Sequence, residues 1–277
     1  MLLSLVLAQA LLVTPAAASF RPVLAQRSAG YRHGPDTLRY HELSRSELTL
    51  HAPTGVRLMD LTHDATIALA FGAGDSVTAW FEALALEAQT LEGARRPATN
   101  SLLGQPFALR LDQRGRATTL RSPSLTSEIL ELTDLSQEFT DFFVRLPVQP
   151  LGLGVEWTDT LVHIVPEARQ TYRKYTAVTR WRVERDSTTA DGPAWILSSQ
   201  GAVTLEAGNP LPASGGRVVS VLEGEERGGA MLSRDGRLLS RAKEGSLTGR
   251  LEMRASSPAR SFEQGYTYWS RITWRQP

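Results

Sequence analysis

The chain has 277 residues, of which 42% are hydrophobic and 21% are charged; this balance is typical of a folded globular protein and excludes a disordered chain. Its 30 basic and 29 acidic residues leave a formal charge of +1, which excludes a net field that would attract nucleic acid or an anionic membrane. Cysteine is absent, so we expect no disulfide bond, thiolate metal site, cysteine nucleophile or cysteine-linked lipid anchor.

The N-terminal segment predicts export from the cytoplasm. An apolar run over residues 2–13 is followed by three alanines at positions 16–18, which fit the small-x-small pattern of signal cleavage. The run is shorter than the ~20 apolar residues that a membrane-spanning helix needs. We therefore expect a signal peptide over residues 1–18, with an alternative cleavage after Ala25, and a mature tail over residues 19–36. A retained anchor or a buried core helix is the alternative.

From residue 37 onward, apolar and polar residues alternate with the period of a β-strand. The segments "DATIALAF" (64–71) and "SVTAWFEALALEAQ" (76–89) flank the turn sequence "GAGD" and predict a hairpin. A second hairpin is predicted in "FALRLDQRGRATTLRSP" (107–123), with its turn at "DQRG".

One helix is predicted to interrupt the strands, at residues 124–146. Apolar residues recur there at three- and four-residue steps and form one stripe, made of Leu125, Ile129, Leu132, Leu135, Phe139, Phe142 and Leu146. Ser124 is suited to cap the first turn, and Pro147 ends the helix. A stiff crossover through Pro147 and Pro150 then leads into a strand at residues 154–161.

The second half of the chain returns to alternation, in segments 171–186, 194–208 and 246–255 and in the aromatic-rich end "GYTYWSRITW". The fold class that these patterns predict is β-rich α+β. We expect one or more curved antiparallel sheets, or a half-barrel, packed on the main helix at 124–146. The mature chain would contain a first β half with the helix (37–146) and a second β half (147–277), or form one continuous domain.

Most motifs of catalysis and metal binding are absent. The sequence contains no G-x-S-x-G elbow, no phosphate-binding loop and no H-E-x-x-H pair, and its histidines are scattered singly. Asp60, His63 and Asp64 cluster in "DLTHDAT", where His63 could be a base oriented by a carboxylate. Such residues more often bind backbone donors in a turn, so we expect no catalytic residue, no metal site and no cofactor.

The large aromatic residues permit two interpretations. Buried rings most often fill a core, and Phe139, Phe142 and Trp157 would then form a structural joint where helix, crossover and sheet meet. Alternatively, the rings line an apolar cleft between sheet and helix. The candidates for such a cleft are Phe139, Phe142, Trp157, Trp181 and Trp195.

Two segments, "SLLGQPFALRLDQRGR" and "DFFVRLPVQPLGLGVEWTDT", carry a resemblance to known proteins. Together with the export signal, they resemble an uncharacterised family of secreted, Gram-negative-type bacterial proteins. At fold level the chain also distantly resembles the LolA and LppX envelope lipoprotein carriers, in which a cupped antiparallel sheet lined by helices holds acyl chains. The resemblance implies an apolar cavity and transfers no functional residue.

These observations favour an exported, non-enzymatic envelope protein, periplasmic or secreted, that binds an apolar or lipid-like ligand in a cleft between sheet and helix. One alternative is a structural or interaction protein of the envelope with a filled core and a protein partner. Lower-ranked alternatives are a small outer-membrane barrel and a hydrolase with a distributed site. Neither nucleic acid nor a covalently attached lipid is expected as a partner.

Overall fold

The computed structural model of the chain describes residues 30–31, 36–51, 55–165, 172–211, 216–254 and 260–275. The predicted signal peptide, its alternative cleavage site and most of the predicted tail lie outside these residues. Among the described residues, no helix has the length and apolar character needed to cross a membrane.

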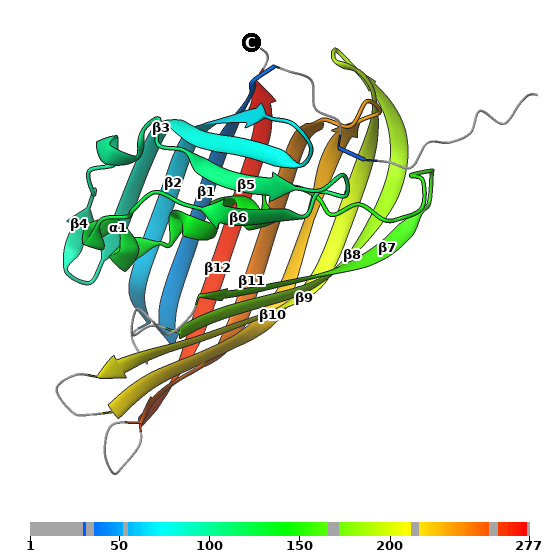
Figure 1. Cartoon of the computed structure of the whole chain (residues 1–277). Helices are drawn as coiled ribbons and strands as arrows, with labels where there is room; N and C mark the ends of the chain where they lie inside the picture. The colour runs from blue at the N-terminus through cyan, green and yellow to red at the C-terminus, as the bar shows by residue number, and fades with distance from the viewer. Residues whose placement is uncertain are drawn as a thin grey trace, which may run out of the picture.

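Twelve strands form one sheet, and its named strand pairs are antiparallel (Figure 1). The strands are β1 (Leu38–His51), β2 (Val56–Phe71), β3 (Ser76–Thr90), β4 (Gly93–Arg95), β5 (Phe107–Leu111), β6 (Ala117–Arg121), β7 (Glu156–Val165), β8 (Tyr172–Thr189), β9 (Gly192–Leu211), β10 (Gly216–Ser233), β11 (Leu238–Arg254) and β12 (Arg260–Arg275). The helical turns are η1 (Asn100–Leu102), α1 (Ser127–Leu132) and η2 (Leu135–Asp141).

The order of the strands across the sheet joins both parts of the chain. It runs β6-β5-β3-β2-β1-β12-β11-β10-β9-β8-β7, with β4 paired to β3. Neighbours in sequence are mostly neighbours in space, because the hairpin connections are short. The exception is β1, which pairs with β12 along its length, from Arg39↔Arg275 to His51↔Glu263. Strands from both expected halves of the chain therefore belong to one sheet.

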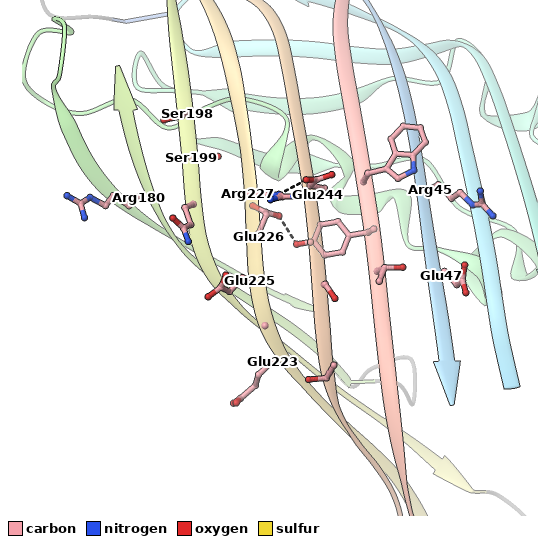
Figure 2. A pocket seen from close by; sticks show the side chains of 18 of the residues that line it. Arg45, Glu47, Arg180, Ser198, Ser199, Glu223, Glu225, Glu226, Arg227 and Glu244 are labelled. Carbon is pink, nitrogen blue, oxygen red and sulfur yellow. Dashed lines mark hydrogen bonds and ion pairs between the residues drawn. The ribbon is translucent and has the colours of Figure 1, made fainter. Parts of the chain in front are cut away.

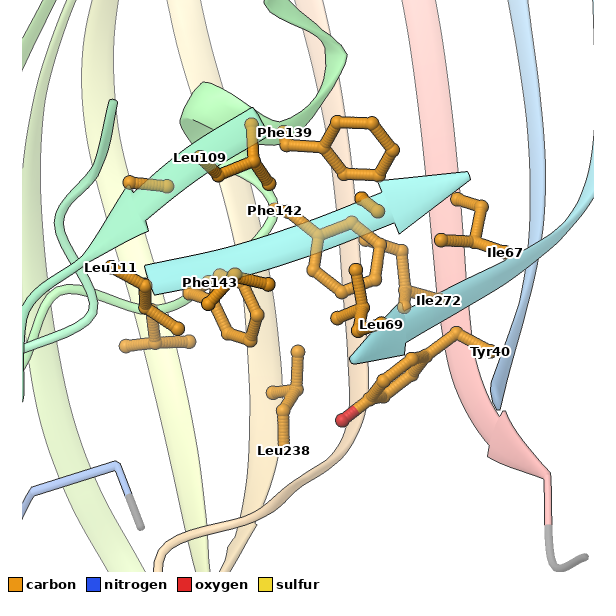
Figure 3. Packing of buried hydrophobic residues seen from close by; sticks show 14 of the residues in the cluster. Tyr40, Ile67, Leu69, Leu109, Leu111, Phe139, Phe142, Phe143, Leu238 and Ile272 are labelled. Atoms are coloured by element: carbon orange, nitrogen blue, oxygen red, sulfur yellow. The ribbon is translucent and has the colours of Figure 1, made fainter. Parts of the chain in front are cut away.

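The segment between β6 and β7 lies across one face of the sheet, which we call the inner face (Figure 1). Its rings and aliphatic side chains pack on residues from both ends of the sheet. Phe139 and Phe142 are fully buried in the main core cluster, where the ring of Phe142 lies edge-on to Tyr40 with centroids 5.2 Å apart (Figure 3). Burial of such large rings contributes several kcal/mol to folding, on the order of 2–3 kcal/mol each.

The predicted helix at 124–146 is wrong in its length. The structure has a helix of six residues, α1, and then a 3₁₀ helix of seven residues, η2. The break lies at Thr133, whose backbone is extended, and at Asp134, whose carboxylate accepts a hydrogen bond from Ser136 N at 2.9 Å. An aspartate that binds a nearby backbone N–H stabilises a new start rather than a continuing helix.

The predicted fold class is therefore corrected. The structure is β-rich, as the alternation indicates, but its described residues form one sheet of twelve antiparallel strands with a single short α-helix. There is no long main helix in the described residues on which a curved sheet or half-barrel could pack. The hairpins predicted around "GAGD" and "DQRG" are present as β2–β3 and β5–β6.

Candidate functional site

A cavity of about 520 Å³ lies between the α1–η2 segment and the inner face of the sheet. Much of its lining is apolar, and we call this part the leucine wall. It includes Leu48, Met59, Leu61, Leu132, Leu161, Leu205, Val218, Leu222, Leu247 and Leu251. Five sheet strands, β7 to β11, each contribute one inward-facing side chain to a smaller core cluster that is separate from the main one. This cluster consists of Leu161, Ala177, Val203, Leu222 and Leu247. The strand period of two puts these side chains on one face.

Asp141 and Lys243 line the cavity, and Arg241 and Glu226 lie next to them outside the lining. We call these four residues the charged floor. Arg241 Nη2 and Lys243 Nζ donate to the two carboxylate oxygens of Asp141 at 2.9 Å and 2.6 Å, and Arg241 also donates to the backbone carbonyl of Asp141. Lys243 Nζ lies 3.8 Å from Glu226 Oε2. Arg241 and Glu226 are buried, so these ion pairs are shielded from water.

The charged floor keeps its groups ionised in spite of burial. Burial by itself would raise the pKa of Asp141, but Arg241 and Lys243 outweigh it and hold this pKa well below its ordinary value. Burial would likewise lower the pKa of Lys243, and Asp141, Tyr175 and Glu226 reverse that effect and raise it. The floor therefore carries two fixed cations against two fixed anions at neutral pH.

Two tyrosines connect the charged floor to the leucine wall. Tyr268 and Tyr175 donate their hydroxyl hydrogens to Glu226 Oε2 at 2.7 Å and 3.3 Å. Burial raises the pKa of both hydroxyls, so they remain donors. Gly245 makes room for this arrangement, because a Cβ at that position would lie 2.5 Å from the Tyr268 ring.

A second chamber of about 230 Å³ adjoins the first, sharing Glu138, Asp141 and Lys243 among its lining residues. It contains Glu42 and His63 on neighbouring strands and Glu138 on η2. Burial lowers the pKa of His63, so its imidazole is neutral. Burial, the charge of Glu42 and a hydrogen bond with Glu42 all raise the pKa of Glu138. The carboxyl groups of Glu42 and Glu138 are therefore close neighbours in this chamber, and their interaction disfavours the ionised form of Glu138.

The five aromatic candidates for a ligand cleft lie elsewhere. Phe139, Phe142 and Trp181 are buried in the main core cluster, and Trp157 and Trp195 pack against it. The lining of the 520 Å³ cavity includes none of these five side chains. Phe139 lies on η2 and Phe142 directly follows it, and Phe142 also lines the chamber of about 230 Å³. Trp157, Trp181 and Trp195 belong to β7, β8 and β9.

The alternative interpretation of three of these rings, as a structural joint, matches their positions. Trp157 Nε1 donates to the carbonyl of Arg145 at 2.8 Å, and its ring stacks on Trp181 with centroids 6.2 Å apart. Phe139 and Phe142 lie with their centroids 6.0 Å apart. Trp157, where the crossover enters β7, therefore contacts both the chain at Arg145, before the crossover, and the neighbouring strand β8.

The candidate cluster of Asp60, His63 and Asp64 is not assembled. Asp60 forms an ion pair with Arg45, and Asp64 Oδ1 accepts from His41 Nε2 at 2.8 Å. His63 is one position out of phase with both aspartates on β2, so it points to the inner face while they point outward. The structure brings His63 to Glu42 and Glu138 instead.

Sequence reasoning missed the charged floor, although a signal for it exists. Glu226 follows Leu222 at an even spacing on β10, and Arg241 and Lys243 precede Leu247 at even spacings on β11. Residues at even spacing on a strand share a face, so each of these charges was placed on the inner face by its own strand. A charge at such a position requires a partner on another element, and Asp141 is that partner.

A larger groove of about 1250 Å³ lies along the sheet but has a different character (Figure 2). Its lining mixes cations and carboxylates that pair with each other, as Arg227 and Glu244 do at 2.5 Å. These two side chains are 79% and 55% exposed, so water screens them strongly. The cavity beneath the α1–η2 segment, with its leucine wall and buried charges, is therefore the candidate site.

Comparison with known proteins adds little to this geometry. No protein-family model matches the sequence, and no curated protein matches it. Among solved structures, the chain is similar to the crystal structure of Pseudomonas aeruginosa OccK2 (OpdF), with 8% sequence identity, coverage of 86% of this chain and 98% of that chain, and a TM-score of 0.23. A likeness at this level carries no argument about fold or function.

Proposed function

We propose that the protein is an exported, non-enzymatic protein of the cell envelope that binds an amphiphilic, lipid-like molecule in the 520 Å³ cavity. The observation that carries the proposal is a leucine wall and a buried charged floor at one cavity. The volume is within the range of about 300–1,000 Å³ that is usual for small-molecule sites. Export is supported by the N-terminal sequence pattern.

The leucine wall and the charged floor define the chemistry of the ligand. An alkyl chain on the leucine wall gains about 0.8 kcal/mol for each buried CH₂. The charged floor carries two cations and two anions, so it has no net charge to offer an anionic head group. Tyr175 and Tyr268 can exchange hydrogen bonds with a hydroxyl or amide. A neutral head group, as in a monoacylglycerol, therefore fits better than a fatty-acid carboxylate.

Fluorescence of phenylnaphthylamine, a neutral apolar dye, tests this function. We expect the dye to become bright on binding and to be displaced by a monoacylglycerol at lower concentration than by the fatty acid of equal chain length. Val218→Trp, which projects into the cavity from β10, should abolish the signal. Val221→Trp is the matched control, because Val221 is 40% exposed on the same strand.

The outcome that contradicts the proposal is equally defined. A wild-type protein that binds neither the dye nor any lipid would exclude the cavity as a lipid site. The same conclusion follows if Val221→Trp and Val218→Trp reduce binding equally while both retain the wild-type melting temperature. A filled-core protein of the envelope would give the first of these results.

One observation favours an outer-membrane protein as a second function. Strands β7 to β12 follow one another in up-and-down order and are 10 to 20 residues long, enough for the ~10 residues that a membrane-spanning strand needs. Against it, the charged pairs of Arg180 with Glu156 and Arg227 with Glu244 lie exposed on the sheet. A protein that stays monodisperse without detergent would exclude this function.

A further inference from the structure

The second chamber brings together three side chains of the types that bind metal ions. Glu42 on β1, His63 on β2 and Glu138 on η2 each offer one ligand atom, and these atoms all lie within 4.8 Å of one another. We propose that Glu42, His63 and Glu138 bind a divalent transition-metal ion, with Zn²⁺ as the ion that their chemistry fits best. Two carboxylates and one neutral imidazole form a usual set of three protein ligands for zinc.

Strand register explains how residues distant in sequence meet here. Glu42 pairs with Ala65 across β1 and β2, and Ser44 pairs with His63. Glu42 and His63 are therefore diagonal neighbours on the inner face, a separation that long side chains bridge. Glu138 reaches the same place from the segment that covers this face, and its Oε1 lies 3.7 Å from His63 Nδ1.

The spacing is close to that of a bound ion. Ligand bonds of about 2.0–2.1 Å in a tetrahedral zinc site place neighbouring ligand atoms roughly 3.3 Å apart. The separation of 3.7 Å between His63 Nδ1 and Glu138 Oε1 is a few tenths of an ångström longer. The other separations within the set are at most 4.8 Å, so binding of the ion requires the glutamate side chains to move inward.

Glu42 has a buried polar atom that lacks a partner. Its Oε2 has no hydrogen-bond partner within the described part of the chain, and the residue is only 6% exposed. A buried polar atom without a partner is costly, so its presence points to a partner that the protein chain does not supply. The other oxygen of Glu42 accepts from Ser270 Oγ at 3.3 Å, which orients the carboxylate.

Three protein ligands leave a coordination position open. That position faces the chamber of about 230 Å³, which has room for a water molecule or a group of a bound ligand. Zinc sites with three protein ligands keep such an open position. Because the chamber shares lining residues with the larger cavity, the ion has an entry path from the open end of the sheet.

Titration of the chelator-treated full chain with Zn²⁺ tests the site, with calorimetry for stoichiometry and a thermal melt for stability. We expect one ion per chain and a rise in melting temperature. Glu138→Gln should weaken Zn²⁺ binding at least tenfold but should not lower the melting temperature without metal, since it removes one of two neighbouring carboxyl groups. If Glu138 had only a structural role, Glu138→Gln would lower the melting temperature without metal and would not selectively weaken Zn²⁺ binding.

His63→Gln should also weaken Zn²⁺ binding at least tenfold, and Glu138→Gln alone decides the outcome if His63→Gln does not fold. His163→Gln is the matched control: His163 lines the neighbouring cavity and has an unpartnered Nε2 but does not belong to the set of three. It should bind Zn²⁺ as the wild type does. The site is overturned if the wild type binds no Zn²⁺, if Glu138→Gln binds it unchanged, or if His163→Gln loses it equally. Lipid binding plays no part in this experiment, so the two proposals fail separately.

Discussion

At the residue scale, the inner face of the sheet holds charges where alternation alone would place apolar side chains. Arg241 is buried and donates to both the carboxylate and the backbone carbonyl of Asp141. Removing two charges from water is expensive, and their attraction compensates only when the remaining donors and acceptors are also satisfied. The extra bonds from Lys243 to Asp141 supply that compensation, so the three residues act as one unit.

Breaking this unit should be costly for stability. Arg241→Met removes the buried cation and leaves the half-buried Asp141 with Lys243 alone, and we expect the free energy of unfolding to fall by about 3 kcal/mol. Arg180→Met is the control, because Arg180 is 70% exposed in its ion pair with Glu156, and it should change stability little. Urea denaturation measures both. Equal losses in the two variants would show that burial of the ion pair is unimportant.

The same unit predicts a pH dependence. Arg241 and Lys243 overcome the effect of burial and lower the pKa of Asp141, so the stability that Asp141 contributes is present above its unfolded pKa of about 3.9 and is lost as pH falls toward its folded pKa. The wild type should therefore exceed Asp141→Asn in free energy of unfolding at neutral pH. This difference should shrink as the pH is lowered below about 4.

Urea denaturation at several pH values measures that difference. Asp186→Asn is the control, because Asp186 pairs with Arg234 where both side chains are largely exposed, and it should give a small difference at every pH. A gap between wild type and Asp141→Asn that stays constant down to pH 2 would contradict the role of Asp141.

At the element scale, the segment between β6 and β7 covers the inner face of the sheet. The predicted apolar stripe is present in the segment. Most residues of the stripe lie on a short α-helix and a 3₁₀ helix separated by a break, rather than on one long helix. The ring of Phe139 shows the result, since its centroid lies 5.1 Å from Phe107 and 6.0 Å from both Phe81 and Phe142. Packing of Phe139 against these three rings holds the segment in place, and continuous helical hydrogen bonding is not needed.

Truncation of that ring tests the role of the segment. Phe139→Ala should lower the free energy of unfolding by about 3–5 kcal/mol, because it removes a fully buried ring and leaves a cavity. Leu153→Ala, in the same connection but at a side chain that is 72% exposed, should change it by less than about 0.5 kcal/mol. Calorimetric melts measure both. A wild-type melting temperature for Phe139→Ala would mean that the segment is not part of the core.

At the scale of the whole molecule, the pairing of β1 with β12 makes the two parts of the chain interdependent. The main core cluster draws Ile67 and Phe81 from the first part and Trp181 and Leu232 from the second. We therefore expect that neither part can bury its share of apolar surface alone and that the two expected halves fold as one unit.

Separation of the halves tests this dependence. Residues 37–146 and 147–277, expressed separately, should each melt without a cooperative transition. The control is a circular permutant that links the end of β12 to the segment before β1 and opens the turn at 234–237. It keeps the sheet pairings and should melt cooperatively, because exposed turns tolerate new termini. A cooperative melt of either half alone would show that the halves are independent domains.

Several features of the fold could be predicted from the sequence because they depend on neighbours in the chain. The "GAGD" and "DQRG" turns and the alternation around them determine the hairpins β2–β3 and β5–β6. The helix was less predictable. A stripe at three- and four-residue steps fits both one long helix and two short helical pieces, and Asp134 decides between them through its hydrogen bond to Ser136 N.

The sequence by itself determined the alternation that makes this protein β-rich, the turns, and the presence of an apolar stripe between the two groups of strands. Only the tertiary structure decided which side chains meet. Glu42, His63 and Glu138 converge because the register of β1 against β2 and the docking of η2 act together, and Asp141 meets Arg241 a hundred positions later. Such contacts depend on the packing of the whole sheet, and no local pattern of residues records which distant partner a buried charge will find.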